Sequence, residues 1–254
     1  MGQKVILKNE IEVSKMRAAG RVNAKALMEV KAIICPGITT AELDELAETV
    51  IRDHGGTPTF KGYPGPYPYP ATLTVSINRE MVHGIPSGRI IHEGDVVSVD
   101  CGTTLDGFIG DSAFSVGVGE ISQEAKSLVR VTKESLDKGI EQMRPGNRLG
   151  DVSAAIQKHV EGHGFHVPRQ YTGHGVGREM HEPPQVPNFG TPGTGLILKK
   201  GMTIAIEPMV LVGTPRTRVL ADKWTVVSYD NSLTAHFEHS IAIMDDEPLI
   251  LTSL

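Results

Sequence analysis

Apolar residues recur every three or four positions in four segments of the chain, which is the spacing expected of one-sided helices. In the first segment these residues lie between Ile11 and Ile34, and the pattern ends at Pro36-Gly37. Thr39, with Glu42 three residues later, is typical of a capping box at the start of the second helix. The pattern predicts two helix pairs, each joined by a short turn. The predicted helices cover residues 8–34, 39–54, 122–143 and 149–162.

Between and after these helices lie apolar, often β-branched runs bounded by Gly, Pro or Asp, which are typical of strands. Helices precede strands in each part of the chain, and this order favours an α+β fold over alternating βαβ units. We therefore expect a central antiparallel sheet with the helices packed on its outer face. The predicted strands lie in residues 71–77, 95–101, 108–118, 202–212, 224–229 and 234–244.

The two helix pairs and the strands after them repeat along the sequence. Pro36-Gly37 recurs as Pro145-Gly146, 109 positions later, and the strand 94–100 aligns with 201–207 at an offset of 107. An acidic residue ends each of these two aligned strands. Two blocks that agree at nearly one offset indicate a duplication. The sequence thus predicts two pseudo-symmetric halves, about 8–118 and 120–244, within a single catalytic domain covering 1–254.

Composition places the chain among ordinary globular proteins, with 39% hydrophobic residues, 22% charged residues and a net charge of −5. Disordered and fibrous classes are excluded, and the acidic balance disfavours a dedicated nucleic-acid binder, which needs clustered Lys and Arg. Cys35 and Cys101 are too few for a disulfide framework. No apolar run reaches 18 residues, and the N-terminus does not resemble a signal peptide. We expect a cytoplasmic protein without a membrane partner.

Four acidic residues occupy matching places in the two halves. Asp100 and Glu207 end the aligned strands, and each half adds one more acid on a later strand, Asp111 or Glu238. Carboxylates that share a buried space raise one another's pKa and oppose folding. The strand segments themselves contain no Lys or Arg to neutralise them. Two divalent metal ions match the charge of the four acids and are the expected counter-charge.

A nitrogen ligand is available at His174, where glycines on both sides let a metal approach the imidazole closely. The run GHGVG lacks the Lys-Ser/Thr ending of a phosphate-binding loop, which disfavours that interpretation. Oxygen donors with one imidazole suit Mn, Fe, Co or Zn, and the sequence does not choose among these ions. On the residues alone, a dinuclear phosphoesterase is an alternative enzyme class.

The succession Asp100, Asp111, His174, Glu207, Glu238 resembles the dinuclear site of type I methionine aminopeptidases. These enzymes have the pita-bread fold, which they share with prolidase and aminopeptidase P. The resemblance covers nearly the whole chain. It is carried most specifically by Ile77-Asn78, Val82-His83-Gly84-Ile85-Pro86, Gly173-His174-Gly175-Val176-Gly177-Arg178, His181-Glu182, Gly201-Met202-Thr203, Ile206-Glu207-Pro208-Met209, Asp222-Lys223-Trp224-Thr225 and Glu238-His239.

The resemblance implies a role for each matched residue of the metal site. Asp111 and Glu238 would bridge both ions, Asp100 would chelate one of them, and His174 with Glu207 would complete the other. The ions would activate water and polarise the scissile carbonyl, and Glu207 would carry the water proton to the departing amine.

Seven further residues match positions that contact the substrate in the family. The resemblance places His83 near the substrate amide and His181 near the carbonyl oxygen or its tetrahedral successor. Met180 departs from the family pattern, in which an aromatic residue is frequent at this position. Trp224, the only tryptophan, could instead be a core anchor. The matched residues that would form the substrate pocket are Tyr63, Tyr69, Thr74, Met180 and Trp224.

The implied function is removal of the N-terminal methionine from nascent polypeptides when the second residue is small. The implied partners are polypeptide N-termini and, transiently, the ribosome through the catalytic domain's own surface, with the chain acting as a monomer. Two alternatives remain: a prolidase or aminopeptidase P-like peptidase, and a metal-free binding protein on the same fold.

Overall fold

The computed structural model describes residues 5–254. Its helices are α1 (Glu10–Ile33), α2 (Thr40–Asp53), α3 (Gln123–Glu141) and α4 (Leu149–Gly162). Its strands are β1 (Thr57–Pro58), β2 (Leu73–Ile77), β3 (Glu80–Val82), β4 (Val96–Leu105), β5 (Phe108–Gly117), β6 (Thr172–Gly175), β7 (Glu182–Pro187), β8 (Thr203–Ile206), β9 (Met209–Leu211), β10 (Thr217–Val219), β11 (Val226–Ser228), β12 (Thr234–His236), β13 (Glu238–Ala242) and β14 (Leu249–Ile250).

The four predicted helices are confirmed, and their first residues are set by caps. Thr39 and Glu42 form the predicted capping box at α2. The side chain of Ser122 accepts from the backbone of Ala125 at the start of α3. The first helix begins two residues later than predicted because Asn9 caps it. Within residues 5–254, no helix is both long and apolar enough to span a bilayer.

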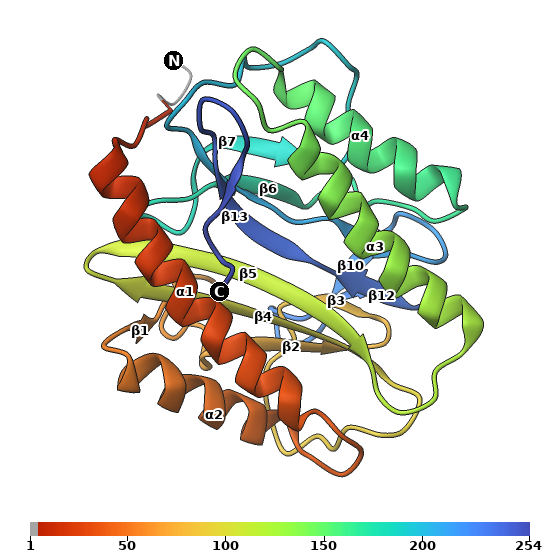
Figure 1. The fold of residues 1–254 in the computed structure, drawn as a ribbon. Coiled ribbons are helices and arrows are strands. Elements are labelled where there is room, and N and C mark those ends of the chain that lie inside the picture. The colour runs from red at the N-terminus through yellow and green to blue at the C-terminus, as the bar shows by residue number, and fades with distance from the viewer. Residues whose placement is uncertain (1–4) are drawn as a thin grey trace.

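A nine-stranded antiparallel sheet forms the centre of the fold, with the strand order β1-β4-β5-β13-β8-β6-β7, β2 beside β4 and β14 beside β13. Figure 1 shows one helix pair, α1 and α2, over the strands of the first half and the other pair, α3 and α4, over those of the second half. The halves meet where β5 pairs with β13. The predicted α+β architecture with a central antiparallel sheet is therefore confirmed.

Two long predicted strands are each divided in the structure, which corrects the sequence prediction. The run 202–212 breaks at Glu207-Pro208 into β8 and β9, and the run 234–244 breaks at Phe237 into β12 and β13. Proline has no N–H to continue a ladder. Pro208 accounts for the first break, and β9 and β12 lie outside the central sheet and pair with each other.

Strand register separates a helix-facing side of the sheet from a site-facing side. The side chain of Asn23 on α1 donates to the backbone carbonyls of Cys101 and Gly110 and accepts from the hydroxyl of Ser112. Because side chains alternate across a strand, the neighbours Asp100 and Asp111 point to the opposite face. The acids are thus directed away from the helices.

Each helix pair has its own apolar core against the sheet. In the first half, Leu43 and Ile51 of α2 pack with Val97 and Val99 of β4, and all four are buried. In the second half, helices α3 and α4 form a second buried cluster with β8 and β13. Two cores hold the two halves of the sheet from one side.

Helix α1 reaches the sheet closely because two glycines meet at the contact. A Cβ on Gly110 of β5 would come within 2.5 Å of the Cα of Gly20, and a Cβ on Gly20 would overlap the carbonyl oxygen of Leu251. The second overlap is with backbone, which has little room to move. The spacing between α1 and β5 therefore depends on the missing side chains.

We predict that Gly20→Ala lowers the free energy of unfolding by about 2 kcal/mol, because overpacking outweighs the helix propensity gained. The matched control is Gly162→Ala at the exposed end of α4, where a new Cβ meets no atom of the described chain within 4 Å. Gly162→Ala is expected to be neutral or stabilising. Urea unfolding followed by circular dichroism measures both variants, and equal stability of Gly20→Ala and the wild type would contradict the packing account.

Candidate metal centre and substrate pocket

Three adjacent strands bring the acids of the first half beside Glu238 of the second. On β4 and β5, Asp100 lies opposite Ala113, and on β5 and β13, Ala113 lies opposite Glu238. Asp111 is two residues from Ala113 and so shares its face. The small alanine side chain between the carboxylates leaves the space above it open.

The second half contributes its residues through the next strands of the same sheet. His174 of β6 lies opposite Ala205 of β8, and Ala205 lies opposite Ser240 of β13. Glu207 follows Ala205 by two residues, just past the end of β8. All of these positions share the face that carries Glu238. The small residues Ala113, Ala205 and Ser240 thus lie side by side on this face of the sheet. Carboxylate and imidazole side chains from both halves surround them.

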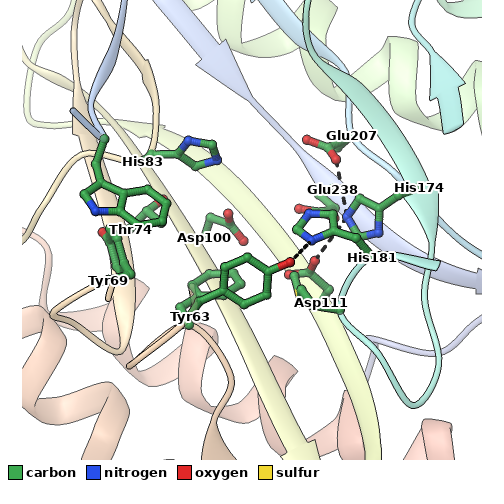
Figure 2. Close-up of a pocket in the computed structure, with 13 residues that line it drawn as sticks. Tyr63, Tyr69, Thr74, His83, Asp100, Asp111, His174, His181, Glu207 and Glu238 are labelled. Atoms are coloured by element: carbon green, nitrogen blue, oxygen red, sulfur yellow. Dashed lines mark hydrogen bonds and ion pairs between the residues drawn. The ribbon is translucent and has the colours of Figure 1, made fainter. Parts of the chain in front are cut away.

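These side chains open into a pocket of about 130 Å³. Figure 2 shows Asp100, Asp111, Glu207 and Glu238 directed toward a common space beside His174. Every site residue predicted from the sequence lines this one pocket. Its lining comprises Phe60, Tyr63, Tyr69, Thr74, His83, Asp100, Asp111, His174, Met180, His181, Glu207, Trp224 and Glu238.

Burial and mutual repulsion change the acidity of the four carboxyls. Burial, followed by the charges of Asp111 and Glu207, raises the pKa of Asp100 well above its usual value. Burial, followed by the charge of Asp111, does the same to the pKa of Glu207. Burial raises the pKa of Asp111 to about 7, and the pKa of Glu238 is also raised by burial and by its acidic neighbours. Without cations the group resists full ionisation.

His174 is held in the form that binds a metal. Its Nδ1 lies 2.9 Å from the carbonyl oxygen of Gly175, so Nδ1–H donates there and Nε2 keeps its lone pair. Nε2 is 3.5 Å from Glu207 Oε1 and 3.7 Å from Asp111 Oδ2. Burial, aided by the nearby His181, lowers the pKa of His174 to about 3. A neutral imidazole with its second nitrogen fixed by a carbonyl is the usual arrangement of a metal ligand.

Unpaired polar atoms test whether this site suits a cation. Within residues 5–254, buried oxygens of Asp100, Asp111 and Glu238 have no hydrogen-bond partner. Buried polar groups are otherwise almost always paired. Donor atoms of Asp111, His174 and Glu238 lie within 4.8 Å of one another, and so do those of Glu207, His236 and Glu238. The donor set fits divalent ions.

Two further histidines border the metal-binding side of the pocket. The hydroxyl of Tyr63 and Nδ1 of His181 are 2.6 Å apart, and the rings of His181 and His174 are 4.3 Å apart between centroids. Burial lowers the pKa of His181, and burial together with the charge of His181 lowers that of His83 to about 4. Both imidazoles are therefore neutral at physiological pH and available for hydrogen bonds to a substrate.

The other side of the pocket is aromatic and close-packed. The ring of Trp224 meets that of Tyr69 edge to face, with centroids 5.1 Å apart, and Tyr69 is buried. In the proline-rich loop, Gly65 lies so close to the Trp224 ring that a Cβ there would overlap it. Tyr67 donates to the carbonyl of Asp222. This loop braces Trp224, which lines the pocket.

Sequence reasoning missed two residues of this region. Phe60 lines the pocket. Its position just before the aromatic loop is the one feature of the sequence that indicated this. His236 is buried, with Nε2 3.7 Å from both Glu207 Oε2 and Glu238 Oε2 and no hydrogen-bond partner among the described residues. It ends β12, whereas Glu238 begins β13 on the other side of the break at Phe237. His236 adds an imidazole beside the predicted donor set.

The chain matches a known enzyme family over most of its length. The model of metallopeptidase family M24 matches residues 14–245. The chain belongs to metallopeptidase family M24. A curated relative, the methionine aminopeptidase of Clostridium acetobutylicum, is 51% identical over 249 residues, which cover 98% of each chain.

Solved structures of two other proteins agree with this fold. A methionine aminopeptidase from Thermotoga maritima matches with a TM-score of 0.96 and 48% identity, covering 99% of this chain and all of the other. A prolidase from Pyrococcus furiosus matches with a TM-score of 0.80 and 20% identity, and there the match covers 98% of this chain but only 66% of the prolidase. The predicted pita-bread fold is confirmed, and the full-length match is to methionine aminopeptidases.

We predict that the metal-free protein loses stability between pH 7.5 and 8.5. The raised pKa values mean that the folded state binds more protons than the unfolded state, so stability falls as pH rises. Unfolded histidines are already neutral in this window.

Thermal unfolding of chelator-treated protein at the two pH values measures this loss. Adding a divalent metal should reduce the pH dependence, because cations replace protons at the carboxylates. An unfolding temperature of the metal-free protein that is constant or rises with pH would contradict the electrostatic account.

Proposed function

We propose that this chain is a methionyl aminopeptidase, which hydrolyses the first peptide bond of polypeptides that begin with methionine and have a small second residue. The observation that carries the proposal is the junction of a five-ligand carboxylate and imidazole set with a narrow aromatic pocket. The relatives named methionine aminopeptidase match over essentially the full length of the chain, which supports this choice over prolidase.

Two divalent ions, of Mn, Fe, Co or Zn, would be held by Asp100, Asp111, His174, Glu207 and Glu238. In this assignment Asp111 and Glu238 would contribute to both ions, Asp100 to one, and His174 with Glu207 to the other. Such ions lower the pKa of bound water and polarise the scissile carbonyl. The four carboxylates then balance the charge of the two ions.

The chain's own residues position the substrate and move the proton. Glu207 would accept the proton of the attacking water and pass it to the departing amine, acting first as general base and then as general acid. His83 contacts the substrate amide. His181, fixed through Nδ1 by Tyr63, uses Nε2 to bind the carbonyl oxygen and the charge that develops on it. Removing Nε2–H donation at this position would weaken transition-state binding.

Selectivity for methionine follows from the apolar side of the pocket. Tyr69, Thr74, Met180 and Trp224 are among the residues that line the pocket and would surround the methionine side chain. The shape of the pocket must exclude other side chains, because a difference of one methylene changes the binding free energy by only about 1–3 kcal/mol. The flexible side chain of Met180 can adapt to the thioether of the substrate. Larger or branched side chains would overlap Trp224, which the aromatic loop holds in place.

The biological context is part of the same proposal. The substrates are the N-termini of nascent polypeptides in the cytoplasm, which the chain meets as a monomer with residues 1–254 as one catalytic domain. Any transient contact with the ribosome would use the surface of this domain. A free α-amine held beside the carboxylates would confine cleavage to the first peptide bond.

We predict that the purified protein releases methionine from Met-Ala peptides at least about 100-fold faster than from Met-Lys peptides, because the proposed activity requires a small second residue. Release should require added Mn, Fe or Co and stop with a chelator. Free methionine is quantified by mass spectrometry. Faster hydrolysis of X-Pro peptides would favour a prolidase, and inertness with all three metals would refute the proposal.

The role of Glu207 is tested by Glu207→Gln, which keeps the shape of the side chain and removes its proton-accepting charge. Turnover should fall by at least about 100-fold while the far-ultraviolet circular dichroism spectrum stays unchanged. Wild-type activity in this variant would overturn the role given to Glu207.

A further inference from the structure

A second group of ligand-type side chains lies on the outer helices of the second half. We name it the α3–α4 cluster, and it consists of Glu134 on α3 with His159 and His163 on α4. It borders a surface groove of about 350 Å³ that His159 and His163 help to line. In Figure 1 both helices lie in front of the sheet, whereas the carboxylates of the pocket face away from the helices. None of the three residues is among those that line the substrate pocket.

The geometry of the cluster is close to that of a three-ligand metal site. His163 follows His159 by four positions, so both lie on one face of α4, with ring centroids 4.6 Å apart. Nε2 of His159 is 3.0 Å from Oε2 of Glu134. One donor atom from each residue lies within 4.8 Å of the other two. Donors around a tetrahedral zinc ion lie roughly 3.3 Å apart, so the three side chains would have to move closer together to bind one.

The protonation of His163 is already suited to binding. Its Nδ1 lies 2.8 Å from the carbonyl oxygen of His159, so Nδ1–H donates to the backbone and Nε2 carries the free lone pair. Metal-bound histidines typically donate their second ring nitrogen to a carbonyl in this way. At His159, an ion would take the place of the proton now shared between Nε2 and Glu134.

The duplicated first half provides an internal comparison. The residues 109 positions earlier are Lys25, Val50 and His54. His54 makes the same backbone contact, with Nδ1 2.8 Å from the carbonyl oxygen of Val50. There the ammonium of Lys25 lies 2.8 Å from Nε2 of His54. A cation therefore already lies beside this imidazole in the first half, whereas the second half offers a carboxylate and another imidazole.

Neighbouring cations set a limit on the affinity. Arg130 contacts both carboxylate oxygens of Glu134 at 2.9 Å, and Lys138 and Lys158 line the groove. The pair of Arg130 with Glu134 is exposed and spans one helical turn, so it contributes little and can be displaced. His159 is 18% exposed and Glu134 39% exposed, which leaves room for water as the remaining ligand.

We propose that Glu134, His159 and His163 bind one divalent transition-metal ion of the zinc class, with water completing the coordination. Two imidazoles and one carboxylate form an established zinc donor set. Because the ligands come from two helices, the ion ties α3 to α4 on the surface of the second half. The site is separate from the catalytic centre and does not depend on the proposed peptidase activity.

Equilibrium dialysis of untagged full-length protein against a buffered Zn²⁺ concentration, followed by metal analysis, tests the proposal. The wild type should bind one Zn²⁺ per chain more than His163→Gln or Glu134→Gln, since loss of one ligand weakens the site by at least about tenfold. Both variants should retain peptidase activity with the catalytic metal supplied. Arg130→Gln should bind the additional ion about twofold more tightly, because it removes the competing cation.

The matched control is His54→Gln, the equivalent substitution in the first half. It should bind as many Zn²⁺ ions as the wild type. Equal Zn²⁺ content in the wild type, His163→Gln and Glu134→Gln would overturn the proposal. So would an equal loss in His54→Gln, because that result would indicate non-specific binding to surface histidines.

Discussion

Four carboxylates in one buried space are the constraint on which the rest of the structure depends. Uncompensated, they repel one another and keep their protons, as the raised pKa values of Asp100, Glu207 and Glu238 indicate. The sheet accommodates them by placing Ala113 and Ala205 beneath the site and a neutral His174 beside it. The pocket tolerates this charge only when cations are bound. Such cations would activate water, and the carboxylates would bind the free amine of a peptide.

The two-half architecture explains how the chain assembles this site and why it is asymmetric. Each half supplies two acids from equivalent strands, so neither half alone holds a complete ligand set. The parts that differ between halves surround the shared centre: the proline-rich loop braces Trp224 on one side, and the glycine-rich strand β6 presents His174 on the other. The same divergence appears on the outer helices, where Lys25 in one half corresponds to Glu134 in the other.

Much of this was predictable from the sequence, and the failures have physical reasons. Helical periodicity and the caps at Thr39 and Ser122 located the helices, because these signals are local. The break at Pro208 was hidden in an apolar run, and β6 and β7 are too rich in glycine and proline to look like strands. Asp100, Glu207 and their counterparts emerged from the repeat, whereas most pocket residues required the family resemblance. Phe60 and His236 were missed because tertiary packing alone brings them to the site.

The most direct test of the central claim is a crystal structure of the protein grown with Mn²⁺ and measured at the manganese absorption edge. The account predicts two anomalous peaks in the pocket, both in contact with Asp111 and Glu238, one beside Asp100 and the other beside His174. A pocket without anomalous density, or ions bound only outside it while the four carboxylates remain protonated, would contradict the account.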